Sequence, residues 1–200
     1  KDGDVDFDDF FILSDNFGKT GKIEFTDCGE ENRTYSEAVT WQTTAERGSG
    51  HCVRQTEEGD VYVIGGGYFV DGTNGVVLFK FDRKGEKEWF RVLGYNMLGI
   101  SLDQTEDGSF VVTGAEFLPA GALSGFLMKI DEQGNHLWEP KMLDFPGMAV
   151  RQTIDGGFIV AGFNSDYIHL HKTNAKGGEE WSANYGLGYA YSVEQTVDSG

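Results

Sequence analysis

Five aspartates stand within the first nine residues, and their spacing suits a hard cation. The segment reads Asp-Gly-Asp-Val-Asp-Phe-Asp-Asp from residue 2. Carboxylate oxygens are the ligands that calcium prefers, and a glycine lets the chain turn sharply around the ion. The pattern makes Asp2, Asp6 and Asp9 side-chain ligands, while Asp4 offers its backbone carbonyl. The sequence therefore predicts a calcium site at this segment.

The same segment resembles half of a dockerin-like EF-hand. Val5 falls at the apolar position of such a loop, and residues 7–16 predict a short exiting helix that Gly18 ends. The resemblance implies calcium as the cofactor, but two further ligands of the loop would precede Lys1. We therefore expect weak binding, roughly millimolar. The alternative is that the aspartates form a solvated acidic tail.

His169 and His171 are a second pair of candidate ligands. Two residues apart on a strand, they point to one face, and two imidazoles on one face can ligate zinc or copper. Alignment of the repeats described next puts Val77 and Phe79 at the same places in another copy. No third ligand is identifiable. We therefore favour the interpretation that both histidines fill core positions between sheets.

The elements that must position these residues repeat along the chain. Arg-Gln-Thr-Glu-Glu-Gly begins at Arg54 and recurs with variation at Asp103, Arg151 and, in part, Glu194. Each full copy is followed by an apolar, β-branched run that ends in glycine. These runs predict strands.

A second signature follows each apolar run. It reads Lys-x-Asp-x-x-Gly-x-x-x-Trp from Lys80 and Lys129, and with Asn for Asp from Lys172. The tryptophans of successive copies are 48, 49 and 43 residues apart. Because they recur in phase with the strands, we expect the tryptophans and the apolar runs to be buried packing anchors. These residues are Trp41, Trp89, Trp138, Trp181, Phe110, Val112, Phe158 and Val160.

Each copy predicts four strands, which in the first copy span 51–56, 60–66, 75–82 and 87–94. No helical period appears after residue 20. Four strands in each unit of 43–49 residues are typical of β-propeller blades. The prediction is an all-β fold with three complete four-stranded blades, partial blades and a short N-terminal helix.

Both signatures resemble known repeats. Asp-x-x-Gly-x-x-x-Trp resembles the tryptophan repeat of quinoprotein-like propellers, and Gln-Thr-x-Asp-Gly-Gly-Phe-Ile-Val-Ala-Gly resembles the blade repeat of large secreted bacterial proteins of that superfamily. The resemblance covers about residues 39–200 and implies a propeller. Such propellers host enzymes and binding scaffolds alike. Quinoprotein dehydrogenases often carry adjacent cysteines, whereas Cys28 and Cys52 are not adjacent, and the sequence leaves open whether they form a bridge.

The spacings also predict the domain organisation. A calcium-loop segment (1–20) precedes a linker with the end of a partial blade (21–50), and the blades fill 51–200. Their bounds are 51–94, 100–143 and 148–186, with the next blade starting at 191. We expect an arc cut from a longer protein, with two open edges. The alternative is a four-bladed ring in which 22–44 completes the blade that starts at 191.

The residue before each Gln-Thr alternates in charge: Arg54, Asp103, Arg151, Glu194. If the first strands are innermost, neighbouring blades offer each other opposite charges. Ion pairs that fix blade order are the interpretation we favour, and a polar channel site is the alternative. The recurrent Gln and Thr are expected to satisfy backbone groups of the turn.

Length varies between the second and third strands of each copy, which predicts loops that tolerate insertion. Aromatic side chains beside amides and carboxylates in these loops suit sugars or peptides. The candidate ligand residues are Tyr68, Phe69, Asp71, Asn74, Phe117, Asn164, Asp166 and Tyr167.

The composition and the missing motifs argue against several classes of partner and of enzyme. With 33 acidic and 16 basic residues, the net charge is −17, which disfavours nucleic acid and anionic membranes as partners. No apolar run is long enough to insert into a bilayer. G-x-S-x-G, P-loop, HExxH and CxxC motifs are absent from the sequence.

We therefore predict a non-catalytic binding module or scaffold, secreted or on the cell surface, with a protein or carbohydrate ligand, as a monomer or an edge-paired arc. The alternative is a fragment of a propeller enzyme, a quinoprotein oxidoreductase or a glycan-active enzyme, whose active site lies in missing blades.

Overall fold

A computed structural model of the chain describes residues 22–23, 39–40, 48–69 and 73–196. The described structure is almost entirely β-sheet, and its helical part is a single turn of 3₁₀ helix, η1 (Pro119–Gly121). None of the helical structure described could span a bilayer. Two short strands, β1 (Lys22–Ile23) and β2 (Val39–Thr40), pair with each other. The predicted helix at 7–16 lies outside the described residues.

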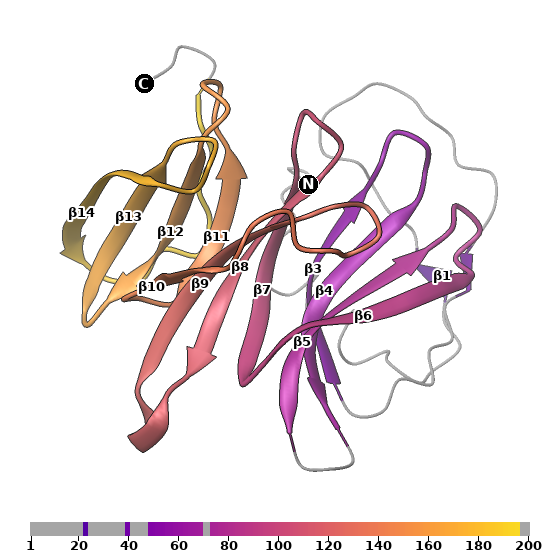
Figure 1. Cartoon of the computed structure of the whole chain (residues 1–200), viewed down its shortest axis with the longest axis horizontal. Coiled ribbons are helices and arrows are strands. Elements are labelled where there is room, and N and C mark those ends of the chain that lie inside the picture. The colour runs from indigo at the N-terminus through magenta and orange to yellow at the C-terminus, as the bar shows by residue number, and fades with distance from the viewer. Residues whose placement is uncertain (1–21, 24–38, 41–47, 70–72, 197–200) are drawn as a thin grey trace.

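Three antiparallel sheets of four strands account for the rest of the fold (Figure 1). In each sheet the strands lie in chain order, so every connection is a hairpin. The first sheet holds β3 (Gly48–Gln55), β4 (Val61–Tyr68), β5 (Asn74–Phe81) and β6 (Lys87–Tyr95). The second holds β7 (Met97–Gln104), β8 (Phe110–Phe117), β9 (Leu123–Ile130) and β10 (Lys141–Leu143). The third holds β11 (Gly147–Gln152), β12 (Phe158–Asn164), β13 (Tyr167–Thr173) and β14 (Glu179–Leu187). Four strands for each full copy of the repeat are thereby confirmed.

The second signature of the repeat is explained by a turn that we call the Asx–Gly turn (82–85, 131–134 and 174–177). In the first sheet, the Asp82 carboxylate accepts hydrogen bonds from the backbone N–H groups of Lys84 and Glu86, at 2.8 and 2.9 Å. Gly85 closes the turn with a φ of 83°, a conformation that glycine adopts without strain. The other two copies make the same bonds through Asp131 and Asn174.

The sheets pack through their first strands. β7 lies against β3, β4 and β5, and β11 lies against β7 and β8. Two clusters of apolar side chains fill the two junctions. The predicted anchors Phe110, Val112, Phe158 and Val160 are fully buried in them, which confirms that part of the prediction.

The tryptophans are less uniform than predicted. Trp138 of the second sheet is half-buried, and its ring centroid lies 6.4 Å from that of Phe158 in the third sheet. Trp89 is also half-buried and packs edge-on against Tyr62 at 6.1 Å. Burial is wrong for Trp181, which is 43% exposed. In the described residues no sheet follows the third one along the chain, so none covers Trp181 as the following sheet covers Trp138. Trp41 lies outside the described residues.

Candidate functional site

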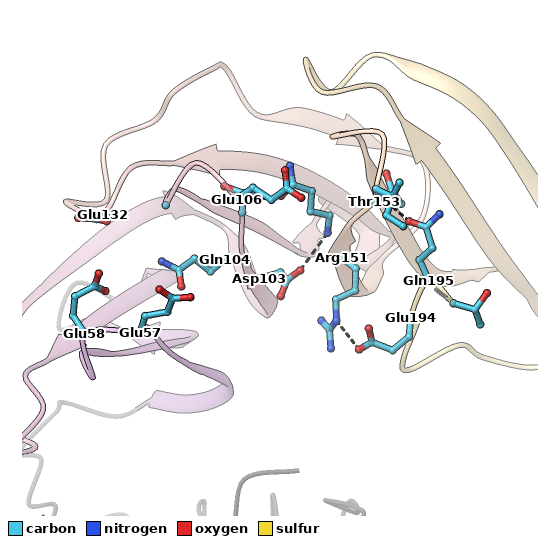
Figure 2. Close-up of a pocket in the computed structure, with 15 residues that line it drawn as sticks. Glu57, Glu58, Asp103, Gln104, Glu106, Glu132, Arg151, Thr153, Glu194 and Gln195 are labelled. Atoms are coloured by element: carbon cyan, nitrogen blue, oxygen red, sulfur yellow. Dashed lines mark hydrogen bonds and ion pairs between the residues drawn. The ribbon is translucent and has the colours of Figure 1, made fainter. Parts of the chain in front are cut away.

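A hollow opens at the end of the sheets where each first strand turns into the second. We call this the turn end, and the connections there the Gln–Thr turns (55–60, 104–109 and 152–157). The hollow measures about 690 Å³, and residues of all three turns and of segment 194–196 line it (Figure 2). The repeat explains this convergence, because the same turn ends the first strand of each sheet.

Ion pairs at this hollow link Asp103 to the first strand of the preceding sheet and Arg151 to segment 194–196. Arg54 Nε lies 3.2 Å from Asp103 Oδ1, and Arg151 Nε lies 2.7 Å from Glu194 Oε1. The second oxygen of Asp103 accepts a hydrogen bond from the backbone N–H of Gln152 at 3.2 Å. Asp103 therefore contacts both neighbouring sheets, and the predicted ion pairing between sheets is confirmed.

The recurrent glutamines bridge turns in the same direction. Gln152 accepts a hydrogen bond from the backbone N–H of Glu106 in the preceding turn, and Gln195 accepts one from Ile154, both at 2.8 Å. Gln152 also donates to its own turn, at the carbonyl of Gly156, as the sequence predicted. Gln104 makes no equivalent bond to the first turn in the described part of the chain, and Figure 2 shows it turned toward Glu57 and Glu58.

Two of the three Gln–Thr turns are held by a Thr–Asp–Lys set. Thr105 donates to Asp107, which also pairs with Lys129 at 2.7 Å. In the third sheet, Thr153 donates to Asp155, which pairs with Lys172 at 2.8 Å. The lysine partner is the main cause that holds the pKa of each aspartate well below its usual range.

The first turn departs from this arrangement because Glu58 stands where the other turns have aspartate. Lys80 pairs instead with Asp60, at 2.6 Å, and with Glu88, at 2.8 Å. These two bonds raise the pKa of Lys80 above its usual range. The Thr56 hydroxyl is buried and has no hydrogen-bond partner among the described residues.

Several carboxylates face the hollow without a bonded partner. Within the described ranges, no hydrogen bond or ion pair engages the carboxylates of Glu57, Glu58, Glu106 or Glu132. The hollow is therefore acidic, with Arg151 as a balancing cation that Glu194 already pairs. The part of the chain that the structure describes holds no set of three side chains arranged for a metal ion.

The predicted ligand loops lie at the opposite end of the same strands, the loop end. Backbone hydrogen bonds connect two of these loops, from the Asn96 N–H to the Asn74 carbonyl and from the Phe117 N–H to the Asn96 carbonyl. Phe117 and Tyr167 are 44% and 46% exposed.

The remaining loop candidates differ in their surroundings. Phe69 packs edge-on against Tyr95 at 6.0 Å. Asn164 is half-buried and Asp166 is exposed. The side-chain oxygen of Asn74 is buried without a hydrogen-bond partner in the described residues. The side chain of Tyr68 and all of Asp71 lie outside the description.

His169 and His171 are buried in the junction between the second and third sheets, at 6% and 8% exposure. His169 Nδ1 lies 2.6 Å from the side-chain oxygen of Asn184. Both rings pack against Phe145, at centroid distances of 4.3 and 6.0 Å. The interpretation of these histidines as core residues is confirmed.

The sequence offered a polar channel site only as the alternative for the alternating charges before Gln-Thr, and Asp103, Arg151 and Glu194 do line the hollow. The glutamates that make the hollow acidic were not predicted, because they stand at variable turn positions. The predicted calcium ligands Asp2, Asp4, Asp6 and Asp9 lie outside the described residues.

Comparison with known proteins adds little. No family model matches the chain, and neither does any curated protein. A crystal structure of glucose dehydrogenase is 9% identical over 84% of this chain and 82% of that chain, with a TM-score of 0.38. A structure of a protein of unknown function from Bacteroides caccae is 11% identical over 74% of this chain and 86% of that chain, with a TM-score of 0.27. Similarity this low carries no argument about function.

Proposed function

We propose that the chain is a section of a β-propeller that serves as a non-catalytic binding module or scaffold outside the cytoplasm. The observation that supports the propeller is the repeated contact between successive first strands. Segment 191–196 repeats this contact, because Glu194 and Gln195 bond the third sheet as Asp103 and Gln152 bond the sheets before them. In this propeller the segment is the first strand of a further blade.

The electrostatics favour a scaffold over an enzyme. The aspartates with a shifted pKa, Asp82, Asp107, Asp131 and Asp155, all shift downward, so they remain ionised at neutral pH. A carboxyl group that acts as a general acid needs a raised pKa. At the turn end, Asp103, Asp107, Asp155 and Arg151 are instead engaged in bonds that hold the strands and sheets together.

We place the ligand at the loop end, where exposed aromatic rings stand beside amides and carboxylates. Phe117 and Tyr167 offer apolar faces on which a sugar ring or an aromatic peptide side chain can stack. Asn164 and Asp166 add hydrogen-bonding groups next to Tyr167. Protein or carbohydrate is therefore the ligand class, and the net charge of −17 argues against nucleic acid.

A binding screen with matched variants tests this placement. The protein is applied to a glycan array and to a peptide panel, together with a Phe117→Ser/Tyr167→Ser variant and an Ile154→Ser variant. Ile154 is 66% exposed at the turn end, so it controls for the loss of an exposed apolar group. We expect the loop variant to lose binding at least tenfold and Ile154→Ser to retain it. Binding that survives the loop variant, or that only Ile154→Ser removes, would contradict the placement.

Calcium binding at residues 2–9 remains a separate proposal, supported by the spacing of the aspartates. Calorimetry of the chain should give a dissociation constant of roughly a millimolar, because residues 2–9 supply only four of the ligand positions that such a loop uses. Asp9→Ala should abolish the signal. Equal binding by both proteins, or no binding by either, would show that the aspartates are a solvated tail.

A further inference from the structure

The two buried histidines lie where a change of charge would act on the packing of whole sheets. His169 and His171 are on β13, and their cross-strand partners on β12 are Gly162 and Val160. Val160 belongs to the apolar cluster that joins the second and third sheets. Phe145, from the connection between these sheets, belongs to the same cluster and contacts both imidazole rings.

The packing around the pair leaves little room for water. A Cβ added to Gly162 would lie 3.0 Å from the Phe145 ring and 2.1 Å from the carbonyl oxygen of Pro146. The connection therefore presses directly on the strand beside the histidines. An imidazolium ion formed at His171 would lose hydration, and the nearest carboxylate, that of Glu179, lies 3.6 Å from its Nδ1, beyond hydrogen-bond distance, so the charge would be costly.

The charged groups that act on His171 come from three elements. Burial is the main cause that lowers its pKa; the Glu179 carboxylate of β14 opposes this, His169 of β13 adds to the lowering, and Asp144 of the 144–146 connection opposes it. The nearest of these groups, Glu179, lies 3.6 Å from Nδ1 and is itself well exposed, so water screens its attraction. Burial prevails, and the ring stays neutral in the folded protein at neutral pH.

We propose that His171, packed beside His169 against Phe145, is a pH-sensitive contact that loosens the third sheet from the second as the medium becomes acidic. Because the pKa of His171 is lower in the folded than in the unfolded state, the unfolded state binds more protons below about pH 6.5. The stabilisation by the neutral His171 ring is complete above that pH and is lost as the pH falls. The effect starts at the junction, since that is where the charge would appear.

The equivalent positions in the other copies of the repeat indicate which substitutions at His171 to test. In the repeat alignment, Met128 and Phe79 stand in the other two sheets where the third has His171. Met128 is fully buried in the cluster between the first and second sheets, so His171→Met places an apolar side chain that packs at the equivalent position of that junction. His171→Phe places there the residue of the first sheet. His136→Gln changes an exposed histidine at the other junction and serves as the control.

Thermal unfolding is measured at pH 7.5 and pH 5.5, where aspartates stay ionised in both states. We expect the wild-type midpoint to fall by roughly 2–4 °C on acidification. Both His171 variants should lose at least half of that shift, and His136→Gln should keep it. An unchanged wild-type midpoint, or a full shift in both His171 variants, would overturn the proposal.

Hydrogen exchange, corrected for its intrinsic pH dependence, locates the effect. We expect acidification to reduce the protection of β12 and β13 at least threefold while β4 and β5 keep theirs. An equal loss of protection in the first and third sheets would show that acid weakens the whole fold rather than this junction, and it would also overturn the proposal.

Discussion

Trp138 and Trp181 occupy the same place in two copies of the repeat, yet their surroundings differ. Trp138 packs against Phe158 and against Gly177, whose added Cβ would lie 3.0 Å from the indole ring. Trp181 follows the same signature and is 43% exposed. The difference shows that the tryptophan is buried by the Asx–Gly turn of the following sheet rather than by its own.

The outer strands show the same contrast. Leu93 of β6 is buried, and its backbone carbonyl lies 3.0 Å from His136 Nε2 of the second sheet. Tyr185, at the equivalent position of β14, is 49% exposed. A sheet of this repeat therefore completes its packing only when another sheet follows it. We expect stability to be distributed unevenly, with the third sheet the least protected.

The largest expected effect separates the two tryptophans. Trp138→Ala should lower the free energy of unfolding by about 3 kcal/mol, because it leaves a cavity between two sheets. Trp181→Ala should cost less than about 1 kcal/mol, since little of its ring is packed. Urea unfolding of both variants measures the difference. Equal losses would contradict the comparison.

A glycine pair sharpens the comparison further. Gly177 and Gly121 have positive φ angles of 74° and 79°, so alanine is strained at both. A Cβ at Gly177 would also press on Trp138, whereas nothing lies within 4 Å of one at Gly121. Gly121→Ala should cost about 1 kcal/mol and Gly177→Ala about 2 kcal/mol. If both cost the same in urea unfolding, the turn does not cover the tryptophan tightly.

The two ion pairs at the turn end should differ in strength. The side chains of Arg54 and Asp103 are 29% and 18% exposed, whereas that of Glu194, the partner of Arg151, is 68% exposed. A double-mutant cycle with alanine should give a coupling energy of about 1 kcal/mol for Arg54–Asp103 and no more than about 0.5 kcal/mol for Arg151–Glu194. A larger coupling in the exposed pair would contradict the order.

The smallest effect is a gain in stability. Glu58→Asp gives the first turn the residue that accepts the threonine hydroxyl in the other two turns. The Thr56 hydroxyl then has a partner, and unfolding should require about 0.5 kcal/mol more free energy. The control is Glu57→Asp, a change at the neighbouring residue, because the side chains at the equivalent positions of the other two turns do not bond the threonine. A loss of stability in Glu58→Asp alone would show that Thr56 is satisfied in another way.

The sequence could predict what depends on local pattern. The apolar runs after each Gln-Thr turn became strands, the Asx and glycine positions became turns, and the alternating charges before Gln-Thr became the Arg54–Asp103 contact. Each of these follows from backbone geometry or from a register that the repeat itself defines.

What the sequence could not predict depends on neighbours. Trp181 matches its counterparts in type and spacing, and the strand pattern cannot show whether another sheet covers it. Lys80 pairs with Asp60, which stands where the other copies have Ser109 and Gly157, so its partner comes from a position that the repeat leaves variable. Phe145 stands outside both signatures, so its contact with the two histidines had no signal in the repeat.

The central claim is that three successive sheets pack through their first strands, each covering the one before it. Native-state hydrogen exchange of the unmodified chain tests this most directly. We expect the slowest exchange in β7 and β8, which lie between neighbours, and the fastest in β14. Exchange in β14 as slow as in β8, or faster exchange in β7 than in β6, would contradict the account.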